Sequence, residues 1–182
     1  MAKRSKAELR KQMASLRAAV SLEQHERASR ALAEQVMPLL HDAQIVLLYS
    51  ALAHELSLVP LAEALQARGG ATVVYPRVEG PRELTLCHVP KHKDLVPGTF
   101  KVYEPCASAE VIAPAAIDVA LVPGVAFTAG GDRLGYGGGY YDSLLPKLRS
   151  DARTIGVGFE FQLVDELPVE PHDVLLDTVV VV

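Results

Sequence analysis

Hydrophobic residues near the start of the chain recur at helical spacing. They fall three or four residues apart, as on one face of a helix, at Leu9, Met13, Leu16 and Val20. A serine followed three residues later by Glu or Gln is a capping box, which indicates the start of a helix. Ser5 and Glu8 form the first such pair, and Ser21 and Gln24 form the second. We therefore predict one helix after Ser5 and another from Ser21 to about Val36.

Farther along, the apolar residues form short continuous runs. These runs are expected to be strands, at Ile45–Tyr49, Thr72–Tyr75, Leu84–His88, Val119–Val122, Thr154–Val157 and Thr178–Val182. Between them, Leu58–Ala67 is expected to form a helix that Ser57 caps and Gly69 ends, and residues 143–148 a shorter helix. The stretch 90–114 has no clear periodicity and is expected to be loop. Continuous apolar runs are typical of strands covered on both faces, so we predict a three-layer α/β sandwich with a mostly parallel sheet.

Length, charge and cysteine count narrow the class of protein. A chain of 182 residues is expected to form one domain, and a net charge of -4 argues against a nucleic-acid-binding protein. No apolar run approaches the roughly 20 residues that a transmembrane helix needs, and the basic start leads into a charged helix instead of a secretory signal. We expect a monomeric cytoplasmic protein that binds neither membranes nor nucleic acids, with Cys87 and Cys106 both reduced.

The most informative segment is residues 130–142, which read GGDRLGYGGGYYD and are called the glycine run below. Glycine lets the backbone turn through positive φ and approach a ligand closely. The helix expected after the run offers unpaired N–H groups to an anion, and Arg133 adds a fork of donors for phosphate. Asp142, at the far end, can hold a hard cation that bridges phosphates. We interpret the run as a nucleotide phosphate site.

Two common phosphate-binding motifs are absent. No G-x-x-x-x-G-K-[ST] sequence occurs, which excludes a Walker A loop. Gly135-Tyr136-Gly137 is followed by Gly138-Gly139-Tyr140, which lacks the third glycine of a dinucleotide-binding fingerprint. A mobile loop without a ligand is disfavoured, because Leu134 and the tyrosines of the run need surfaces to pack on.

The predicted topology brings polar segments together. In open α/β sheets, ligands bind outside the carboxyl ends of the strands. The segments that leave those ends are Ser50–Glu55, Pro76-Arg77, Pro123–Asp142 and Gly158-Phe159. We therefore expect the site to lie at this edge of the sheet.

The glycine run also resembles the signature of the 5-formyltetrahydrofolate cyclo-ligase family, also called methenyltetrahydrofolate synthetases. The resemblance extends over nearly the whole chain, and it is carried by Lys6, Leu9, Arg10, the segment from Ile45 to Glu55, Glu104-Pro105, Pro123-Gly124, Phe127, the run from Arg133 to Asp142, and Asp173. It implies a Rossmann-like sandwich of the kind shared with sugar-phosphate isomerases and CoA transferases.

The resemblance also implies roles for individual residues. The expected ATP contacts are Lys6, Arg10, Arg133, Leu134, Gly135, Tyr136, Gly137, Gly138, Gly139, Tyr140 and Tyr141. The expected folate contacts are Ser50, Glu55, Tyr136, Gly137, Gly138, Gly139 and Tyr140. Asp142 and Asp173 are expected to hold Mg²⁺, and Arg133 and Tyr140 are expected to be catalytic.

On the residues alone, other interpretations of these positions stay open. Lys6 and Arg10 lie one turn apart and fit a solvated helix face equally well. The helix dipole alone can explain an aspartate at position 142. Glu55 fits an ordinary surface glutamate, and core packing is the favoured interpretation of Tyr141.

The reaction implied by the resemblance converts 5-formyltetrahydrofolate, which can carry a polyglutamate tail, to 5,10-methenyltetrahydrofolate. ATP and Mg²⁺ are required, and ADP and phosphate are released. One departure concerns Gly138, where some members of the family carry a basic residue. Two other functions stay open: a non-catalytic module that binds folate or nucleotide, and a sugar-phosphate isomerase, which would need no ATP.

Overall fold

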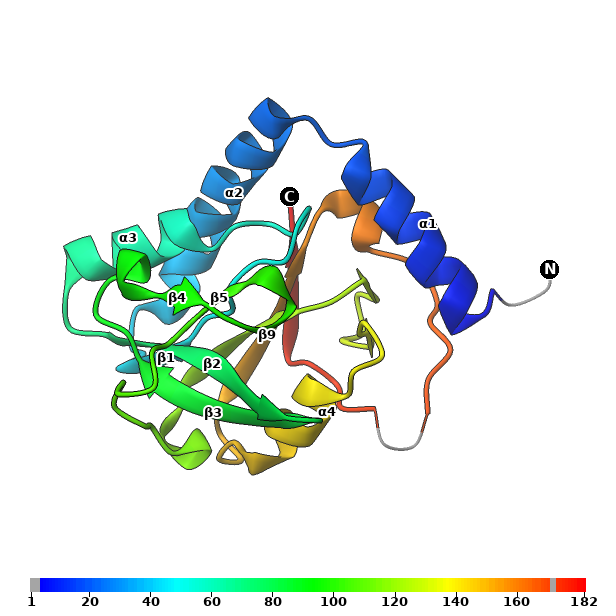
Figure 1. Cartoon of the computed structure of the whole chain (residues 1–182). Coiled ribbons are helices and arrows are strands. Elements are labelled where there is room, and N and C mark those ends of the chain that lie inside the picture. The colour runs from blue at the N-terminus through cyan, green and yellow to red at the C-terminus, as the bar shows by residue number, and fades with distance from the viewer. Residues whose placement is uncertain (1–3, 171–172) are drawn as a thin grey trace.

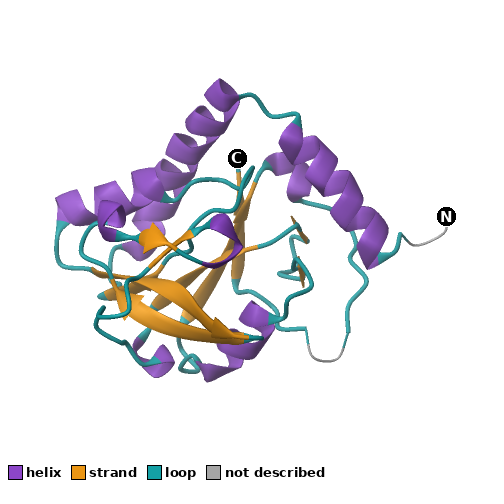
Figure 2. Cartoon of the chain, viewed as in Figure 1, coloured by secondary structure: helices purple, strands orange, loops and turns teal. Residues whose placement is uncertain are grey.

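The computed structural model describes residues 4–170 and 173–182. Its centre is a six-stranded sheet in the order β10-β9-β6-β1-β2-β3 (Figures 1 and 2). The strands of this sheet are β1 (Ile45–Leu47), β2 (Thr72–Gly80), β3 (Glu83–His88), β6 (Val119–Pro123), β9 (Arg153–Gly158) and β10 (Thr178–Val181). Every neighbouring pair is parallel except β2 and β3, which are antiparallel. The prediction of a mostly parallel sheet is confirmed.

Helices cover both faces of this sheet (Figure 2). The α-helices are α1 (Lys6–Ala18), α2 (Leu22–Val36), α3 (Val59–Arg68) and α4 (Tyr140–Leu144). Short 3₁₀ helices occupy Met37–Leu40, His92–Asp94, Thr99–Lys101, Pro114–Ala116, Leu145–Lys147 and Glu160–Gln162. Helices α2 and α3 pack together over one face, and α4 with the 3₁₀ helix that follows it lies on the other (Figure 1).

The strands are apolar on both sides because each side faces a separate core. In β1, Val46 packs in the core with α2 and α3, whereas Leu47 packs in the core with α4. In β6, Val119 and Leu121 face the first core, and the residues between and after them face the second. Successive side chains of a strand point to opposite faces, so a continuous apolar run buries both. The predicted layers are confirmed.

Helix α1 lies apart from α2 and α3 (Figure 1). Ser5 forms the predicted capping box with Glu8, and Leu9 and Met13, two of the residues at helical spacing, are buried. Leu16, which shares their helical spacing, is 39% exposed, and the neighbouring Arg17 is buried instead. The apolar residues of α1 form a third core with Val125, Ala126 and Leu134.

Two small antiparallel pairs were not predicted. The first joins β7 (Ala126–Phe127) to β8 (Arg133–Leu134), so two residues of the glycine run form a strand within the expected loop. The second joins β4 (Val96–Pro97) to β5 (Tyr103–Glu104) within the otherwise irregular stretch 90–114. Runs of two residues give no periodic signal, which explains why the sequence pattern did not predict them.

Three predicted boundaries are corrected. The short helix near residue 143 begins earlier, at Tyr140, because Gly139 adopts a left-handed conformation and ends the loop there. Leu58, not Ser57, is the N-cap of α3, although the Ser57 hydroxyl still accepts the Val59 N–H at 3.2 Å. Strand β2 runs five residues beyond Tyr75, to Gly80, because it pairs with β3 as a long hairpin.

No helix among the described residues is long and apolar enough to cross a membrane.

Candidate active site

Two cavities adjoin at the glycine run, beside the carboxyl ends of β1 and β6. The polar cavity has a volume of about 610 Å³ and is lined by Lys6, Arg10, Arg82, Arg133, Leu134, Gly135, Gly137, Gly139, Asp142, Ser143, Glu170 and Asp173. The apolar cavity has a volume of about 380 Å³, and its lining includes Tyr49, Ser50, Leu52, Glu55, Pro76, Leu84, Phe100, Tyr103, Tyr136, Gly138, Tyr140 and Tyr141. Both cavities are also lined by the same five residues, Arg133, Gly135, Gly137, Gly139 and Asp142.

Helix α1 contributes two cations to the polar cavity. The Lys6 ammonium lies 3.1 Å from Asp173 Oδ2 and 3.2 Å from Glu170 Oε1. Burial lowers the pKa of Lys6, but the two carboxylates together raise it by more, so its pKa lies above its ordinary value. The Arg10 Nε donates to the Gly135 carbonyl at 2.9 Å, which ties α1 to the glycine run. Lys6 and Arg10 both line the polar cavity, so one anionic ligand there could contact both side chains.

Arg133 lies at the boundary between the cavities. Its side chain is 6% exposed, and its guanidinium donates to Asp142 Oδ1 and to the Pro123 carbonyl at 3.4 Å. Burial lowers the pKa of Arg133, while the charge of Asp142 opposes that effect. A guanidinium stays charged at neutral pH in either case. The site therefore holds a fixed positive charge with a half-buried carboxylate beside it.

The backbone of the glycine run requires glycine at two positions beside these cations. Gly137 has a φ of +97°, and a Cβ there would lie 3.7 Å from the Arg10 guanidinium carbon. Gly139 has a φ of +70° and is the N-cap of α4. Because α4 has only five residues, its dipole is small, and the positive charge of the cavity comes from side chains.

Arg82 is a fourth cation of the polar cavity, which the sequence interpretation missed. It lies in the turn between β2 and β3 with a φ of +61°. Its Nε would lie 2.9 Å from a Cβ at Gly139, so the tip of this hairpin meets the glycine run. Arg82 reaches the glycine run because β2 extends to Gly80, five residues beyond the end predicted from the sequence.

The apolar cavity is walled by aromatic and aliphatic side chains. Phe100 and Tyr140 meet edge to face across it, with their ring centroids 5.9 Å apart. Ser50, which follows β1, lines it as well. Such a cavity, with few polar groups, is typical of a site for a small organic ligand.

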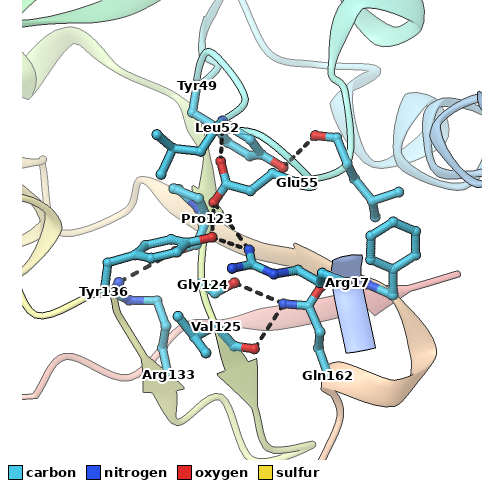
Figure 3. Close-up of polar contacts among 12 residues, drawn as sticks. Arg17, Tyr49, Leu52, Glu55, Pro123, Gly124, Val125, Arg133, Tyr136 and Gln162 are labelled. Carbon is cyan, nitrogen blue, oxygen red and sulfur yellow. Dashed lines mark hydrogen bonds and ion pairs between the residues drawn. The ribbon is translucent and has the colours of Figure 1, made fainter. Parts of the chain in front are cut away.

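A polar cluster borders the apolar cavity; it joins the buried side chains of Arg17 and Glu55 to the hydroxyl of the more exposed Tyr136 (Figure 3). The Tyr136 hydroxyl donates to Glu55 Oε1 and accepts from Arg17 Nη1. The Leu52 N–H donates to the second carboxylate oxygen at 2.7 Å. Burial raises the pKa of Glu55, whereas the hydrogen bonds from Tyr136 and Leu52 and the charge of Arg17 lower it.

Comparison with known proteins identifies the family of this chain. A family model described as the 5-formyltetrahydrofolate cyclo-ligase family matches residues 2–182. The chain belongs to the 5-formyltetrahydrofolate cyclo-ligase family. The resemblance carried by the glycine run is therefore confirmed.

Individual cyclo-ligases agree with this assignment. The 5-formyltetrahydrofolate cyclo-ligase of Escherichia coli K12 is 32% identical over 171 residues, which cover 90% of this chain and 93% of that protein. The NMR structure of the Aquifex aeolicus 5,10-methenyltetrahydrofolate synthetase is 33% identical, with a TM-score of 0.84 over 97% of this chain and 89% of the other. The synthetase of Mycoplasma pneumoniae is 26% identical, with a TM-score of 0.80 over 97% and 98%. The family's fold is thus the fold of this chain.

The residues that the cyclo-ligase resemblance singles out divide between the two cavities. The polar cavity is lined by Lys6, Arg10, Arg133, Leu134, Gly135, Gly137, Gly139, Asp142 and Asp173. Among the expected ATP contacts, four line the apolar cavity and not the polar one: Tyr136, Gly138, Tyr140 and Tyr141. Tyr141 also packs against both cores of the sheet, and its hydroxyl is buried without a partner in the described part of the chain.

The two expected magnesium ligands of this cyclo-ligase chain line the same cavity. Asp142 is paired with Arg133, and Asp173 is paired with Lys6. Within residues 4–170 and 173–182, no group of three or more His, Cys, Asp or Glu side chains could hold a metal ion. Two carboxylates nevertheless fit Mg²⁺ that arrives with a nucleotide, because phosphate oxygens and water complete its coordination.

Proposed function

We propose that this chain catalyses the ATP-dependent conversion of 5-formyltetrahydrofolate to 5,10-methenyltetrahydrofolate, with release of ADP and phosphate. The observation that carries this proposal is the contact between a cationic cavity and an apolar cavity across Arg133 and Asp142. Phosphoryl transfer between two bound substrates needs this arrangement, because the donor and the acceptor must lie in line and close together.

The polar cavity is suited to the triphosphate of ATP. It holds four cationic side chains, Lys6, Arg10, Arg82 and Arg133, beside backbone that glycine leaves open. Arg82 lies where it can supply the positive charge that some family members place at the position of Gly138. Arginine forks and lysine ammonium groups are the usual protein donors to phosphate.

The apolar cavity is suited to the reduced pterin of the folate. Glu55 is a buried carboxylate at its wall, and such a group can accept hydrogen bonds from the pterin amino and ring N–H groups. Tyr140 and Phe100 provide the aromatic surface for the flat part of the ligand. Ser50, in the segment that follows β1, adds a hydroxyl.

Asp142 and Asp173 would hold the magnesium ion that accompanies ATP. A bound magnesium ion neutralises phosphate charge that develops during transfer. Both carboxylates are paired with cations, so Arg133 and Lys6 keep them oriented toward the cavity.

The chemistry follows from the two substrates. The formyl oxygen is a poor leaving group, so it first attacks the γ-phosphorus, which forms an O–P bond and releases ADP. The carbon of the resulting iminium phosphate is electrophilic, and N10 attacks it with loss of its proton. The C–O bond then breaks, and phosphate leaves with the former formyl oxygen. Arg133, fixed beside both cavities, stabilises the charge on the transferred group.

A coupled turnover assay tests this function. Purified protein is mixed with 5-formyltetrahydrofolate, MgCl₂ and ATP, and the absorbance of the methenyl product is followed together with ADP. Equal amounts of both products, lost without ATP, are expected. Folate and nucleotide binding without any product would contradict catalysis and favour a non-catalytic binding module.

A further inference from the structure

Helix α1 contacts the walls of both cavities through one face. Lys6 and Arg10 lie toward its start and line the polar cavity. Arg17 lies near its last turn, on the same face, and reaches the polar cluster at the apolar cavity (Figure 3). Arg17 lines neither cavity, so it contacts a bound ligand in neither of them.

The burial of Arg17 needs an explanation. Its residue exposure is only 7%, and removal of a guanidinium from water is costly unless it is paired. Its Nη1 donates to the Tyr136 hydroxyl and lies 3.9 Å from Glu55 Oε1, and its guanidinium carbon lies 5.2 Å from the centre of the Tyr136 ring. Its Nε has no partner in the described part of the chain. Both partners of the Arg17 guanidinium, Glu55 and Tyr136, line the wall of the apolar cavity.

We propose that Arg17 is a positioning residue, which fixes the Glu55 carboxylate and the Tyr136 hydroxyl at the wall of the apolar cavity. The proposal rests on the proposed function, in which Glu55 recognises the pterin. Because Tyr136 lies between Arg17 and Glu55, one guanidinium orients both groups. Arg17 also ties α1, which carries Lys6 and Arg10, to the folate side of the site.

The charge of Arg17 has a second effect on Glu55. The titratable groups that face this glutamate come from five elements: Arg17 from α1, the His25 ring from α2 at the Glu55 carbonyl, Tyr49 after β1, Tyr136 from the glycine run, and Tyr141 from α4. Of these groups, Arg17 carries the permanent positive charge. Burial raises the pKa of Glu55, and the positive charge of Arg17 lowers it. Loss of Arg17 therefore raises this pKa further and favours the neutral acid, which is a weaker hydrogen-bond acceptor than the carboxylate.

The test compares Arg17→Met with Arg17→Lys. Methionine keeps an unbranched apolar stem and removes the charge, while lysine keeps the charge. Arg17→Met is expected to raise the pKa of Glu55, measured by ¹³C NMR of labelled carboxyl groups, and to move the acid limb of the kcat/KM profile to higher pH by the same amount. The KM for 5-formyltetrahydrofolate is expected to rise about tenfold at neutral pH, with the KM for ATP unchanged within about twofold. Arg17→Lys is expected to leave the acid limb near its wild-type position.

Arg30→Met on the exposed face of α2 is the matched control, and its pH profile should superimpose on that of the wild type. If Arg17→Met also superimposed on the wild type, the proposal would be overturned. Should that variant fail to fold, Tyr136→Phe removes the hydroxyl between Arg17 and Glu55, and an unchanged acid limb there would equally overturn it. The NMR titration needs no turnover, so it separates failure of this proposal from failure of the proposed reaction.

Discussion

The Arg133 guanidinium and the Asp142 carboxylate form an ion pair at the boundary between the polar and apolar cavities. Arg133 comes from β8 and Asp142 from α4, so two elements fix the pair. The side chain of Arg133 is almost fully buried, whereas that of Asp142 is 32% exposed. A phosphoryl group that passes between the cavities must pass this pair, which makes it the centre of the proposed reaction.

Replacement of Asp142 by Asn should affect turnover far more than folding. The substitution keeps the shape of the side chain but removes the charge that can hold magnesium and orient Arg133. We expect kcat to fall about a hundredfold or more, and the melting temperature to fall by only a few degrees. Steady-state kinetics at several MgCl₂ concentrations and thermal unfolding measure the two effects. Asp151→Asn, at an exposed residue, is the control; normal turnover of Asp142→Asn would refute the magnesium assignment.

Arg82 should matter for ATP and not for the folate. It lines only the polar cavity, and among the described residues it forms no ion pair that would hold it away from a phosphate. Arg82→Ala is expected to raise the KM for ATP about tenfold, which equals about 1.4 kcal/mol, and to leave the folate KM unchanged. Arg30→Ala, an exposed arginine of α2, controls for the loss of surface charge. Equal effects on both substrates would show that Arg82 acts on the fold of the glycine run.

Phe100 should matter for the folate and not for ATP. Its ring is 60% exposed but lines the apolar cavity against Tyr140. An aromatic pair contributes about 0.5–1.5 kcal/mol beyond its buried area, so Phe100→Ala is expected to raise the folate KM by about two- to thirteenfold. Val111→Ala, at another exposed apolar residue, should change neither KM. An effect of Phe100→Ala on the ATP KM alone would contradict the assignment of the cavities.

Gly131 should be intolerant of any side chain. Its φ is +93°, and a Cβ there would lie 2.1 Å from the Leu176 carbonyl oxygen. Gly70 is a matched control, because its φ is +79° and a Cβ there would meet nothing within 4 Å. Gly70→Ala is expected to cost about 1 kcal/mol in the free energy of unfolding, from the backbone alone, and Gly131→Ala at least about 2 kcal/mol more. Chemical denaturation measures both free energies of unfolding. Equal losses for the two variants would show that the backbone near Leu176 moves to accommodate the added Cβ at little cost.

Much of the fold could be predicted because the signals were local. Two capping boxes marked the starts of α1 and α2, and continuous apolar runs marked strands buried on both faces. The glycine run and its position after β6 likewise located both cavities.

Residues that depend on tertiary placement could not be found in this way. Arg17 is buried in α1, whereas the hydrophobic spacing marks the neighbouring Leu16, and pairing with Glu55 and Tyr136 offsets the cost of burying its charge. Arg82 reaches the polar cavity because β2 and β3 form a longer hairpin than their apolar residues indicated. Neither contact leaves a periodic signal in the sequence.

The most direct test of the proposed reaction follows the formyl oxygen. 5-Formyltetrahydrofolate labelled with ¹⁸O in its formyl group is incubated with the protein, ATP and Mg²⁺, and the released phosphate is examined by mass spectrometry. If the two cavities carry out one phosphoryl transfer to that oxygen, each phosphate will carry one ¹⁸O atom, in step with methenyl product. Unlabelled phosphate alongside methenyl product would show that ATP is hydrolysed separately, and it would contradict phosphorylation of the formyl group.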